Sequence, residues 1–360
     1  MYNEMRKIII ASFFVGTGIC SVAHAQSSVT LYGRLDSGLD FISNVAQPNG
    51  TSRNLFRYGN NQYCISWWGL QGSEDLGSGF SAVFRLESMF SAGSGSLPTD
   101  ALFGRYAYVG VASDKYGSLW LGRVMALTDE TGWFLDPFGE QATGIANLAK
   151  GRAWGSRANT VTYNSNKYGG FNFRLQNGFG NQAGNFRGSR QLSASAAYTL
   201  TGLSLYGVYE EIRDANGKFS SLYEASQEYM VGATYSWGPL KFYGGYQQLW
   251  SSGSDTTVTA DNPLGATRNS QEWVGLNYQA TDALQLIAAA YHASVNHNGG
   301  SATLGAIGAN YSLSKRTLLY STVGMMFNHG NAAFPVEAQD SPPLPGHNQQ
   351  GFYFGINHFF

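Results

Sequence analysis

Residues 28–41, SVTLYGRLDSGLDF, alternate strictly between apolar and polar side chains. One face of this segment carries Val29, Leu31, Leu35, Leu39 and Phe41, and the other carries Thr30, Tyr32, Arg34, Asp36 and Asp40. A period of two predicts a β-strand with one apolar face and one polar face. The pattern recurs in FNFRLQNG (171–178), EWVGLNYQ (272–279) and GFYFGINHFF (351–360), so it is typical of the whole chain.

The composition supports strands of this two-faced kind. Charged residues make up 12% of the chain, against about 25% in typical globular domains, while 14% are aromatic and 46 of the 360 residues are glycine. After residue 25 no run of ~20 consecutive apolar residues occurs, which excludes membrane-spanning helices. A net charge of −1 argues against nucleic acid as a partner.

The first residues predict export from the cytoplasm. Arg6 and Lys7 precede an apolar run over residues 8–22, and Ala-His-Ala follows at 23–25. This order is typical of a secretory signal peptide, with cleavage before Gln26. The run is shorter than the ~20 residues that a membrane anchor needs. We therefore expect residues 1–25 to be a signal peptide and residues 26–360 to be the mature domain.

Few residues are available for metal or enzyme chemistry. Cys20 leaves with the signal peptide, so Cys64 is the single thiol of the mature chain, which excludes a disulfide framework and a metal site of paired thiols. The sequence has no H-E-x-x-H, G-x-S-x-G or G-K-S/T motif, and we expect no metal, no cofactor and no catalytic residue. One alternative stays open, in which His297 and His329 meet beside Asp255 at the loop rim, as in a barrel protease.

The connections between the expected strands alternate in length. The short ones are 74–79, 114–118, 166–170, 201–202, 238–239, 281–282 and 314–316. The long ones are 44–62, 91–101, 121–163, 178–190, 211–227, 251–271, 294–301 and 328–350. Seven short turns and eight long loops predict about sixteen antiparallel strands, with every long loop at one end of the sheet.

A sheet of this size, apolar on one face, indicates a closed barrel in a membrane. In lipid, each unpaired backbone group at an open edge costs several kcal/mol, so the sheet must close. The polar face would be a poor soluble core but is a suitable wall for a water-filled lumen. Because about sixteen strands enclose an aqueous channel, the expected fold class is an all-β, transmembrane antiparallel barrel.

The segment from Leu121 to Tyr163 begins and ends like a strand but has an irregular middle. Its charges are first acidic, at Asp129, Glu130, Asp136 and Glu140, and then basic, at Lys150, Arg152 and Arg157. Roughly thirty irregular residues between two strands are rare unless they have a function. From the residues alone, this segment is a linker, a lid or a loop folded back into the protein.

Six stretches resemble the general porins of Gram-negative bacteria, specifically the group of neisserial and Burkholderia-type porins. They are SSVTLYGRLDSGLDF (27–41), GLQGSEDLGSGFSAVFRLES (69–88), LFGRYAYVG (102–110), LGRVMALTD (121–129), YSLSKRTLLYSTVG (311–324) and FGINHFF (354–360). The resemblance implies a sixteen-stranded barrel in the outer membrane, usually a homotrimer, that passes ions and small solutes by diffusion. It also implies that the third long loop folds into the barrel and narrows the pore.

The resemblance assigns the charges of this constriction as well. In the family, acids on the inward loop face arginines on the barrel wall, and such charges bias ion entry by sign. The implied loop acids are Asp129, Glu130, Asp136 and Glu140, and the implied wall arginines are Arg105 and Arg157. Arg34 and Arg85 face the lumen by alternation, whereas Arg123 ends its strand and its facing stays open.

One departure from the family pattern concerns two wall cations. Relatives have a stretch like S-R-W-G-L-K-G-S-E-D-L-G, whereas this chain reads SWWGLQGSEDLG, with Trp67 and Gln71 in place of arginine and lysine. If both face the lumen, the wall lacks two positive charges. We then expect weak or cation-preferring selectivity, with Trp67 narrowing the passage.

The last strand of the chain implies a further partner. In the family, a terminal strand ending like Phe360 is the signal that the barrel-assembly machinery reads. The expected partners are therefore outer-membrane lipid, this machinery, further copies of the chain, and small ions and solutes. Two other functions stay open: a barrel enzyme that uses His297 or His329, and a structural or adhesive barrel with a plugged lumen.

Overall fold

The computed structural model describes residues 28–152, 154–252, 258–338 and 341–360. The expected signal peptide, residues 1–25, lies outside the described residues, and so does Asp255. The strands are β1 (Ser28–Ala46), β2 (Ser52–Asn60), β3 (Ser66–Gly77), β4 (Phe80–Phe90), β5 (Tyr106–Ser113), β6 (Gly117–Met125), β7 (Ser156–Asn164), β8 (Phe171–Gly178), β9 (Gln191–Thr199), β10 (Leu203–Ile212), β11 (Gln227–Trp237), β12 (Leu240–Trp250), β13 (Arg268–Gln279), β14 (Leu284–Val295), β15 (Gly300–Ser312), β16 (Thr317–His329) and β17 (Gln349–Phe359). The helices are α1 (Leu127–Leu135) and the 3-10 helix η1 (Ile145–Asn147).

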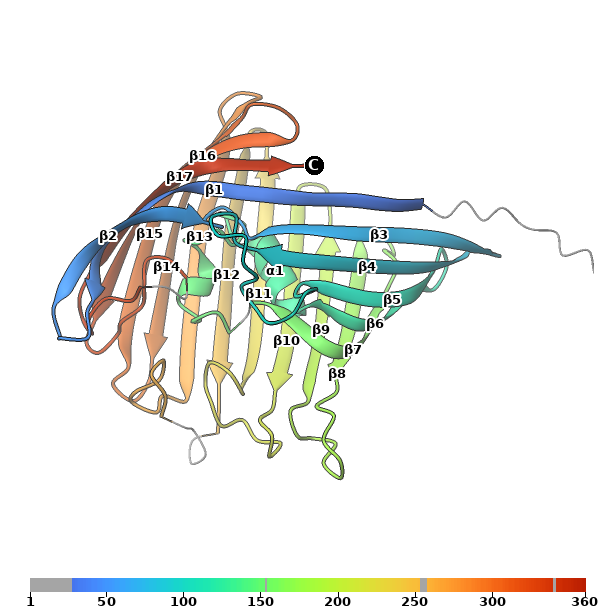
Figure 1. Ribbon diagram of the computed structural model, residues 1–360, viewed down its shortest axis with the longest axis horizontal. Coiled ribbons are helices and arrows are strands. Elements are labelled where there is room, and N and C mark those ends of the chain that lie inside the picture. Colours follow the sequence, from blue (N-terminus) through green and yellow to red (C-terminus); the bar gives the residue numbers. More distant parts are fainter. Residues whose placement is uncertain (1–27, 153, 253–257, 339–340) are drawn as a thin grey trace, which may run out of the picture.

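The strands form one closed antiparallel barrel (Figure 1). Pairing of β1 with β17, from Arg34 opposite Phe359 to Ile42 opposite Gly351, closes the sheet. The seventeen strand segments make sixteen barrel strands, because β2 and β3 pair with successive parts of the single long strand β1. The predicted barrel of about sixteen strands is confirmed. In the described parts of the chain, no helix has the length and apolar character of a membrane span.

The break between β2 and β3 is a short inward excursion of the chain. We call residues 61–65 the inward bulge. Asn61 adopts a φ of 63°, and its side-chain oxygen accepts a hydrogen bond from the backbone N–H of Ser66 at 2.8 Å. The next residue, Gln62, is buried and bonds Glu337 inside the barrel. The bulge therefore interrupts the strand and directs side chains into the lumen.

The prediction of a long loop is wrong at two places in the chain. The stretch 44–62 is mostly strand, because β1 is nineteen residues long and the backbone groups of its far half pair with β2. Only residues 47–51 connect these two strands. The stretch 294–301 is also short, since β14 and β15 are separated by residues 296–299 alone. All seven expected short turns are confirmed.

The outward faces of the strands are apolar, as their alternation predicts. Val29 and Leu31 of β1 are more than 60% exposed, whereas Asp36 and Asp40 on its other face are buried inside the barrel. Phe352, Phe354 and Ile356 of β17 and Val274 of β13 are likewise exposed on the outside. The exterior is therefore an apolar band suited to lipid.

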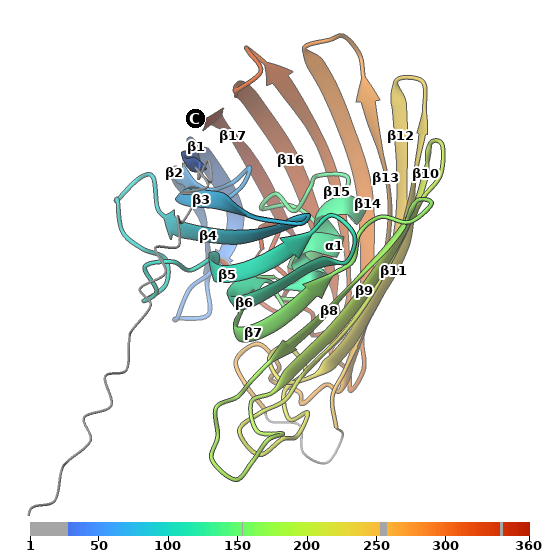
Figure 2. The ribbon, with the colours of Figure 1, turned by 90° about the vertical axis from the view of Figure 1, so that its right-hand side faces the viewer.

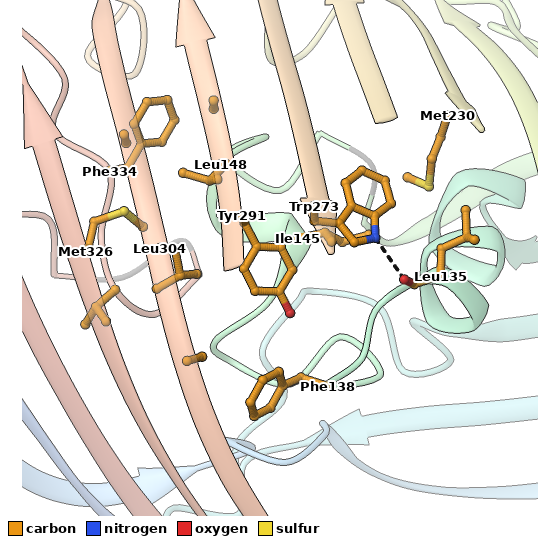
Figure 3. Packing of buried hydrophobic residues seen from close by; sticks show 14 of the residues in the cluster. Leu135, Phe138, Ile145, Leu148, Met230, Trp273, Tyr291, Leu304, Met326 and Phe334 are labelled. Carbon is orange, nitrogen blue, oxygen red and sulfur yellow. Dashed lines mark hydrogen bonds between the residues drawn. The ribbon is translucent and has the colours of Figure 1, made fainter. Parts of the chain in front are cut away.

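The interior, in contrast, is not uniformly polar. Two connections fold inward, namely loop 3 (residues 126–155) and the inner strap (residues 330–338), and in both ribbon views α1 lies inside the ring of strands (Figures 1 and 2). They form the interior apolar cluster (Figure 3) with the wall. Its loop members are Leu127, Leu135, Phe138, Ile145, Leu148, Ala332, Phe334 and Val336, and its wall members are Ile42, Val208, Met230, Trp273, Ile287, Tyr291, Ala293, Ala302, Leu304, Ala306 and Met326. The expectation of a polar inner face on every strand is wrong for β14 to β16, because loops rather than water cover their side chains.

Candidate pore constriction

Loop 3 lies close against the inner wall because glycines leave room for it. A Cβ atom would lie 2.7 Å from Leu135 at Gly232, 2.2 Å from Pro137 at Gly275 and 2.7 Å from Phe138 at Gly308. These glycines come from β11, β13 and β15, so the loop runs across the strands rather than along them. Any larger residue would overlap the loop, since packed interiors hold few voids.

Polar contacts fix the loop at the same place. The indole Nε1 of Trp273 donates to the carbonyl of Leu135 at 2.9 Å (Figure 3), and Asn277 donates to the carbonyl of Pro137 at 3.1 Å. Phe134 of α1 stacks on Tyr206 of β10 with ring centroids 5.4 Å apart. Both donors to the loop come from β13, so this strand holds the end of α1 and the turn that follows it.

Asp136 stabilises the folded conformation of loop 3. Its carboxylate accepts the hydroxyl of Tyr291 at 2.6 Å and the backbone N–H groups of Phe138, Glu140 and Ile145 at 3.1, 3.0 and 3.3 Å. Complete burial still raises its pKa, although these hydrogen bonds act in the opposite direction. Asp136 is expected at the constriction, but the structure places it within the folded loop, and it does not line the cavity described below.

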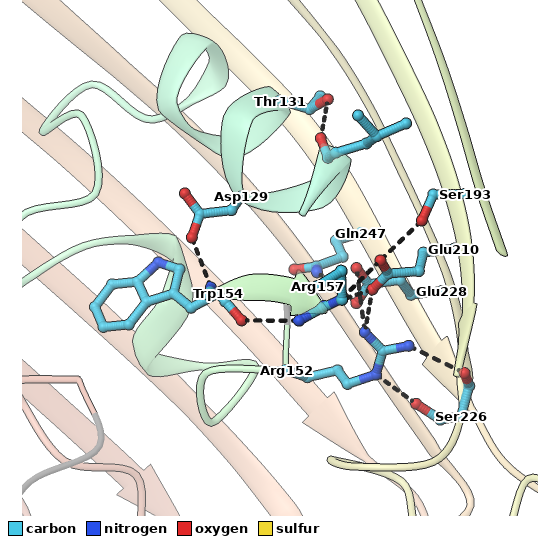
Figure 4. Close-up of polar contacts among 12 residues, drawn as sticks. Asp129, Thr131, Arg152, Trp154, Arg157, Ser193, Glu210, Ser226, Glu228 and Gln247 are labelled. Carbon is cyan, nitrogen blue, oxygen red and sulfur yellow. Dashed lines mark hydrogen bonds and ion pairs between the residues drawn. The ribbon is translucent and has the colours of Figure 1, made fainter. Parts of the chain in front are cut away.

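The return end of loop 3 is held by a buried ionic network (Figure 4). Arg157 reaches Glu210 of β10 through two hydrogen bonds of 2.7 and 3.1 Å, and Arg152 reaches the same carboxylate at 2.7 Å. Arg152 also bonds the side chain and carbonyl of Ser226, and lies 3.8 Å from Glu228. Paired guanidinium and carboxylate groups of this kind satisfy each other's buried charge. The structure therefore pairs Arg157 with wall acids rather than placing it opposite the loop acids.

Between the other side of loop 3 and the wall lies a cavity of about 740 Å³. It is lined by residues from the inward bulge, from β2, β4, β6 and β7, from the connection between β4 and β5, and from both inward connections. Its acids are Asp129, Glu140 and Glu337, and its cations are Arg57, Arg105 and Arg123. Arg123, whose facing was open, thus turns inward, where its Nη1 donates to the carbonyl of Gly104 at 3.5 Å. Opposite charges consequently line one cavity.

The two loop acids of this cavity lie side by side. Asp129 accepts the backbone N–H of Gly155 at 2.7 Å. Burial raises the pKa of Asp129 to about 6, even though that bond and the nearby charges of Arg105 and Arg157 favour its ionised form. Burial and the adjacent Asp129 carboxylate raise the pKa of Glu140 well above its ordinary value. The pair therefore keeps its protons to a higher pH than isolated carboxyl groups do, and it gains negative charge as pH rises.

Glu130 points to a different part of the wall. It forms an ion pair with Arg174 of β8 and accepts the hydroxyl of Tyr106 at 2.8 Å. Tyr106 belongs to an inward-facing aromatic group in which Tyr108 and Trp120 stack with centroids 4.5 Å apart. Glu130 is thus paired on the side of α1 that faces β5 to β8.

The wall arginines share a carboxylate that the sequence analysis missed. Glu87 of β4 is fully buried, with Arg105 Nε at 2.8 Å, Arg85 Nε at 2.7 Å and the Tyr32 hydroxyl at 2.7 Å. Arg85 also lies over the ring of Tyr106, 4.1 Å from its centroid. Strand alternation could have revealed Glu87, because it stands two residues after Arg85 on the same face.

The three remaining predicted wall residues lie on the inner face near this group. Trp67 is opposite Arg34 across β3 and β1, it is buried, and Arg105 lies 5.4 Å from its ring centroid. Arg34 donates to the thiol of Cys64. Gln71 pairs in register with Arg85 and is exposed to the lumen. Trp67 and Gln71, the two positions where relatives have cations, therefore both face inward. This is the condition under which the two substitutions remove positive charge from the lumen wall.

Comparison with known proteins identifies the barrel. Residues 11–331 match the family described as Gram-negative porin. The chain belongs to this porin family. The porin is 27% identical over 360 residues to an outer membrane porin protein of Bordetella pertussis, covering 88% of this chain and 93% of the relative. It is 28% identical over 380 residues to outer membrane porin protein 32 of Delftia acidovorans, covering 99% of this chain and 100% of the relative.

Solved structures show the same fold. The anion-selective porin from Comamonas acidovorans superposes with a TM-score of 0.79 at 22% identity, covering 93% of this chain and all of that one. The trimer form of OmpT of Vibrio cholerae gives a TM-score of 0.66 at 15% identity, covering 93% and 99%. As a member of its family, the porin is a channel protein of the outer membrane, and its family relatives are channels rather than enzymes.

Proposed function

We propose that the cavity beside loop 3 is the constriction of a water-filled channel for ions and small hydrophilic solutes. The observation that carries this proposal is that Asp129 and Glu140 line the same cavity as Arg105 and Arg123. Fixed charges in a narrow pore raise the local concentration of counter-ions and bias entry by sign. Glu130 and Asp136 support the loop from its other sides.

We further propose that the channel has a weak preference for cations. Glu87 offsets one of the two charges of Arg85 and Arg105, and Glu210 binds Arg157, so these arginines add less net positive charge to the passage than their number suggests. Trp67 and Gln71 leave the same wall without two cations. The selectivity of this porin would thus differ from that of the anion-selective Comamonas porin.

The assembly belongs to the same proposal. The porin forms a homotrimer, is inserted by the barrel-assembly machinery through its closing strand ending in Phe360, and has no catalytic residue. The trimer form of the structurally similar OmpT supports the first point. Against a protease site, the ring Nδ1 of His297 lies 2.9 Å from the carbonyl oxygen of Gly265, in the connection between β12 and β13.

Planar-bilayer recording of the purified porin in a salt gradient tests the proposal. We expect stepwise channels whose reversal potential shows mild cation preference. Asp129→Asn should lower the cation-to-anion permeability ratio by about twofold, the effect of one unit charge roughly 8 Å from the ion path in water screened by ~0.1 M salt. Asp282→Asn, which changes an exposed acid in a short turn, is the matched control and should change nothing. An absence of steps, or equal ratios for all three proteins, contradicts the constriction.

A further inference from the structure

The inward bulge brings a thiol to the charged cavity. Cys64 is half-buried, is the free cysteine of the described residues, and lines the cavity together with Asp129 and Arg105. We propose that Cys64 is a modification site, where a hydroperoxide oxidises the thiol to a sulfinate that Arg34 binds. The modification itself does not depend on the proposed channel, whereas its effect on ion selectivity rests on that channel.

Arg34 places a positive charge against the sulfur. Its Nη2 donates to the sulfur of Cys64, and this is the one hydrogen bond that its guanidinium forms within the described chain. In contrast, Arg57, Arg85 and Arg174 on other strands of the wall are each paired with a carboxylate. Reactive cysteines typically lie in such electropositive, partly exposed surroundings, because the anionic sulfur is the nucleophile.

One donor beside this contact is unused. Nε and Nη2 of an arginine stand side by side on one edge of the planar guanidinium. Arg34 is 7% exposed, and its Nε is buried without a hydrogen-bond partner among the described residues. A buried donor without an acceptor costs free energy. A sulfinate on Cys64 carries two oxygens, which match the Nε and Nη2 donors in the way that a carboxylate does.

Trp67 adds a second unused donor to the same wall segment. It is opposite Arg34 in the register of β3 and β1, and it is 8% exposed. Its indole Nε1 is buried and has no hydrogen-bond partner in the described part of the chain. This segment of the wall therefore has more buried donors than acceptors, and a neutral thiol does not satisfy them.

The loop acids of the cavity oppose an anion at Cys64 only weakly. Burial raises the pKa of Glu140 well above its ordinary value, and the charges of Asp129 and Cys64 add to this effect. Glu140 therefore keeps its proton to a higher pH and repels a sulfinate less than an ordinary carboxylate would. Arg34 touches the sulfur directly, and Coulomb energy falls with distance, so the guanidinium is the dominant charge.

The oxidation consumes two molecules of peroxide. The sulfur attacks one oxygen of hydrogen peroxide, an S–O bond forms, the O–O bond breaks, and the other oxygen leaves as water with the proton of the thiol. The sulfur is thereby oxidised to a sulfenic acid, and the peroxide is reduced. A second peroxide adds a second oxygen in the same way, its other oxygen leaves as water, and the resulting sulfinic acid releases a proton.

The sulfenic acid has no second thiol with which to form a disulfide. Cys64 is the free cysteine of the described residues, and Cys20 belongs to the expected signal peptide. A sulfenic acid without a resolving cysteine stays open to further oxidation. The sulfinate is therefore the expected product.

Mass spectrometry of peptides from the peroxide-treated porin tests the site. We expect Cys64 of the native porin to gain two oxygen atoms. The Cys64→Ser, Ser96→Cys double variant carries its thiol at an exposed loop position and is the matched control. Its thiol should react more slowly than Cys64 by about fivefold or more, the effect of one unit charge roughly 4 Å away in water.

Substitution of Arg34 tests the role of the guanidinium. Arg34→Gln should slow the oxidation of Cys64 by about fivefold or more, and Arg34→Lys, which keeps the charge, should recover most of the rate. Arg53→Gln removes an exposed arginine of β2 and should react like the native porin. Circular dichroism and heat-modifiable migration on gels identify the variants that form barrels, and only these are compared. If no Arg34 variant folds, the comparison with the Ser96→Cys thiol decides.

The outcomes separate the modification from the channel. A rate at Cys64 no higher than that of the Ser96→Cys thiol, or equal rates in the native porin and folded Arg34→Gln, overturns the modification site. In planar bilayers, peroxide should raise the cation-to-anion permeability ratio of the native porin by about twofold, as for one unit charge near the path, and should leave Cys64→Ser unchanged. A sulfinate at Cys64 with an unchanged ratio supports the modification site and contradicts the proposed constriction.

Discussion

The inner wall of this porin has two unlike halves. On β10 to β16, loop 3 and the inner strap cover the wall with apolar contacts, in the interior apolar cluster. Along β2, β6 and the connection before β5, charged side chains line a cavity. The first half is a platform for the two inward connections, and the second half contains the proposed passage.

The difference explains how buried acids remain in place beside the passage. Asp129 and Glu140 are desolvated, which costs free energy and favours movement of the loop into water. Trp273 and the glycine at 275 hold the same loop on the opposite wall through packing and a hydrogen bond. Apolar burial contributes about 25 cal/mol per Å², so several large side chains outweigh the strain of a few carboxyl groups.

The largest effect should come from breaking the platform. Gly275→Val places methyl groups where Pro137 lies, and overpacking of this kind typically costs about 1–3 kcal/mol. Loop 3 is then displaced toward the charged half, so we expect a marked fall in single-channel conductance. Gly305→Val is the matched control, because a Cβ there meets nothing within 4 Å. Equal conductance of the two variants would contradict the close seating of the loop.

A second substitution tests how the charges in the charged half of the lumen offset one another. Glu87→Gln removes the carboxylate that Arg85 and Arg105 share, while keeping the size of the side chain. The two arginines then lose the one negative charge that offsets them, and the permeability ratio should move toward anions by about twofold or more. Glu272→Gln, on the outward face of β13, should not change it. A shift toward cations in Glu87→Gln would contradict the compensation of the wall arginines.

The smallest effect is a dependence on pH. Asp129 has a raised pKa of about 6, so it is protonated and neutral below that pH and charged above it. Arg105, Arg157 and Glu140 are the charged or titratable groups that act on it. Cation preference should therefore increase from pH 5 to pH 8, by about twofold for one charge, in reversal potentials measured across that range. Asp129→Asn should reduce this increase, and a ratio that falls with rising pH would contradict the sign.

Local sequence patterns predicted the barrel well. Period-two alternation gave the facing of Val29, Asp36 and Val274, and turn residues gave all seven short connections. The nine-residue helix α1 was missed because it lies in a segment with few repeats to show a helical period. The strand β2 was missed because turn-forming residues surround it.

The constriction was predictable only in part. The resemblance led to loop 3 and its acids, but it did not separate Asp129, which lines the cavity, from Asp136, which bonds Tyr291 of β14. That separation depends on which distant strand each carboxylate meets. Glu337 had no local signal either, since the residue before it, Val336, packs against Gly324 and Gly351 on other segments. Contacts between residues this far apart in the sequence form only when the barrel closes.

The most direct test asks which half of the lumen is open, and it uses Cys64, the free thiol of the described residues. Cys64 lines the cavity, whereas Ala306 is buried beneath loop 3 on the platform. A cationic methanethiosulfonate reagent is added during bilayer recording to the native porin and to the Cys64→Ser, Ala306→Cys double variant. We expect stepwise loss of current for the native porin and no loss for the double variant. Loss of current in the double variant, with the native porin unaffected, would place the passage on the wrong wall and contradict the two-halved lumen.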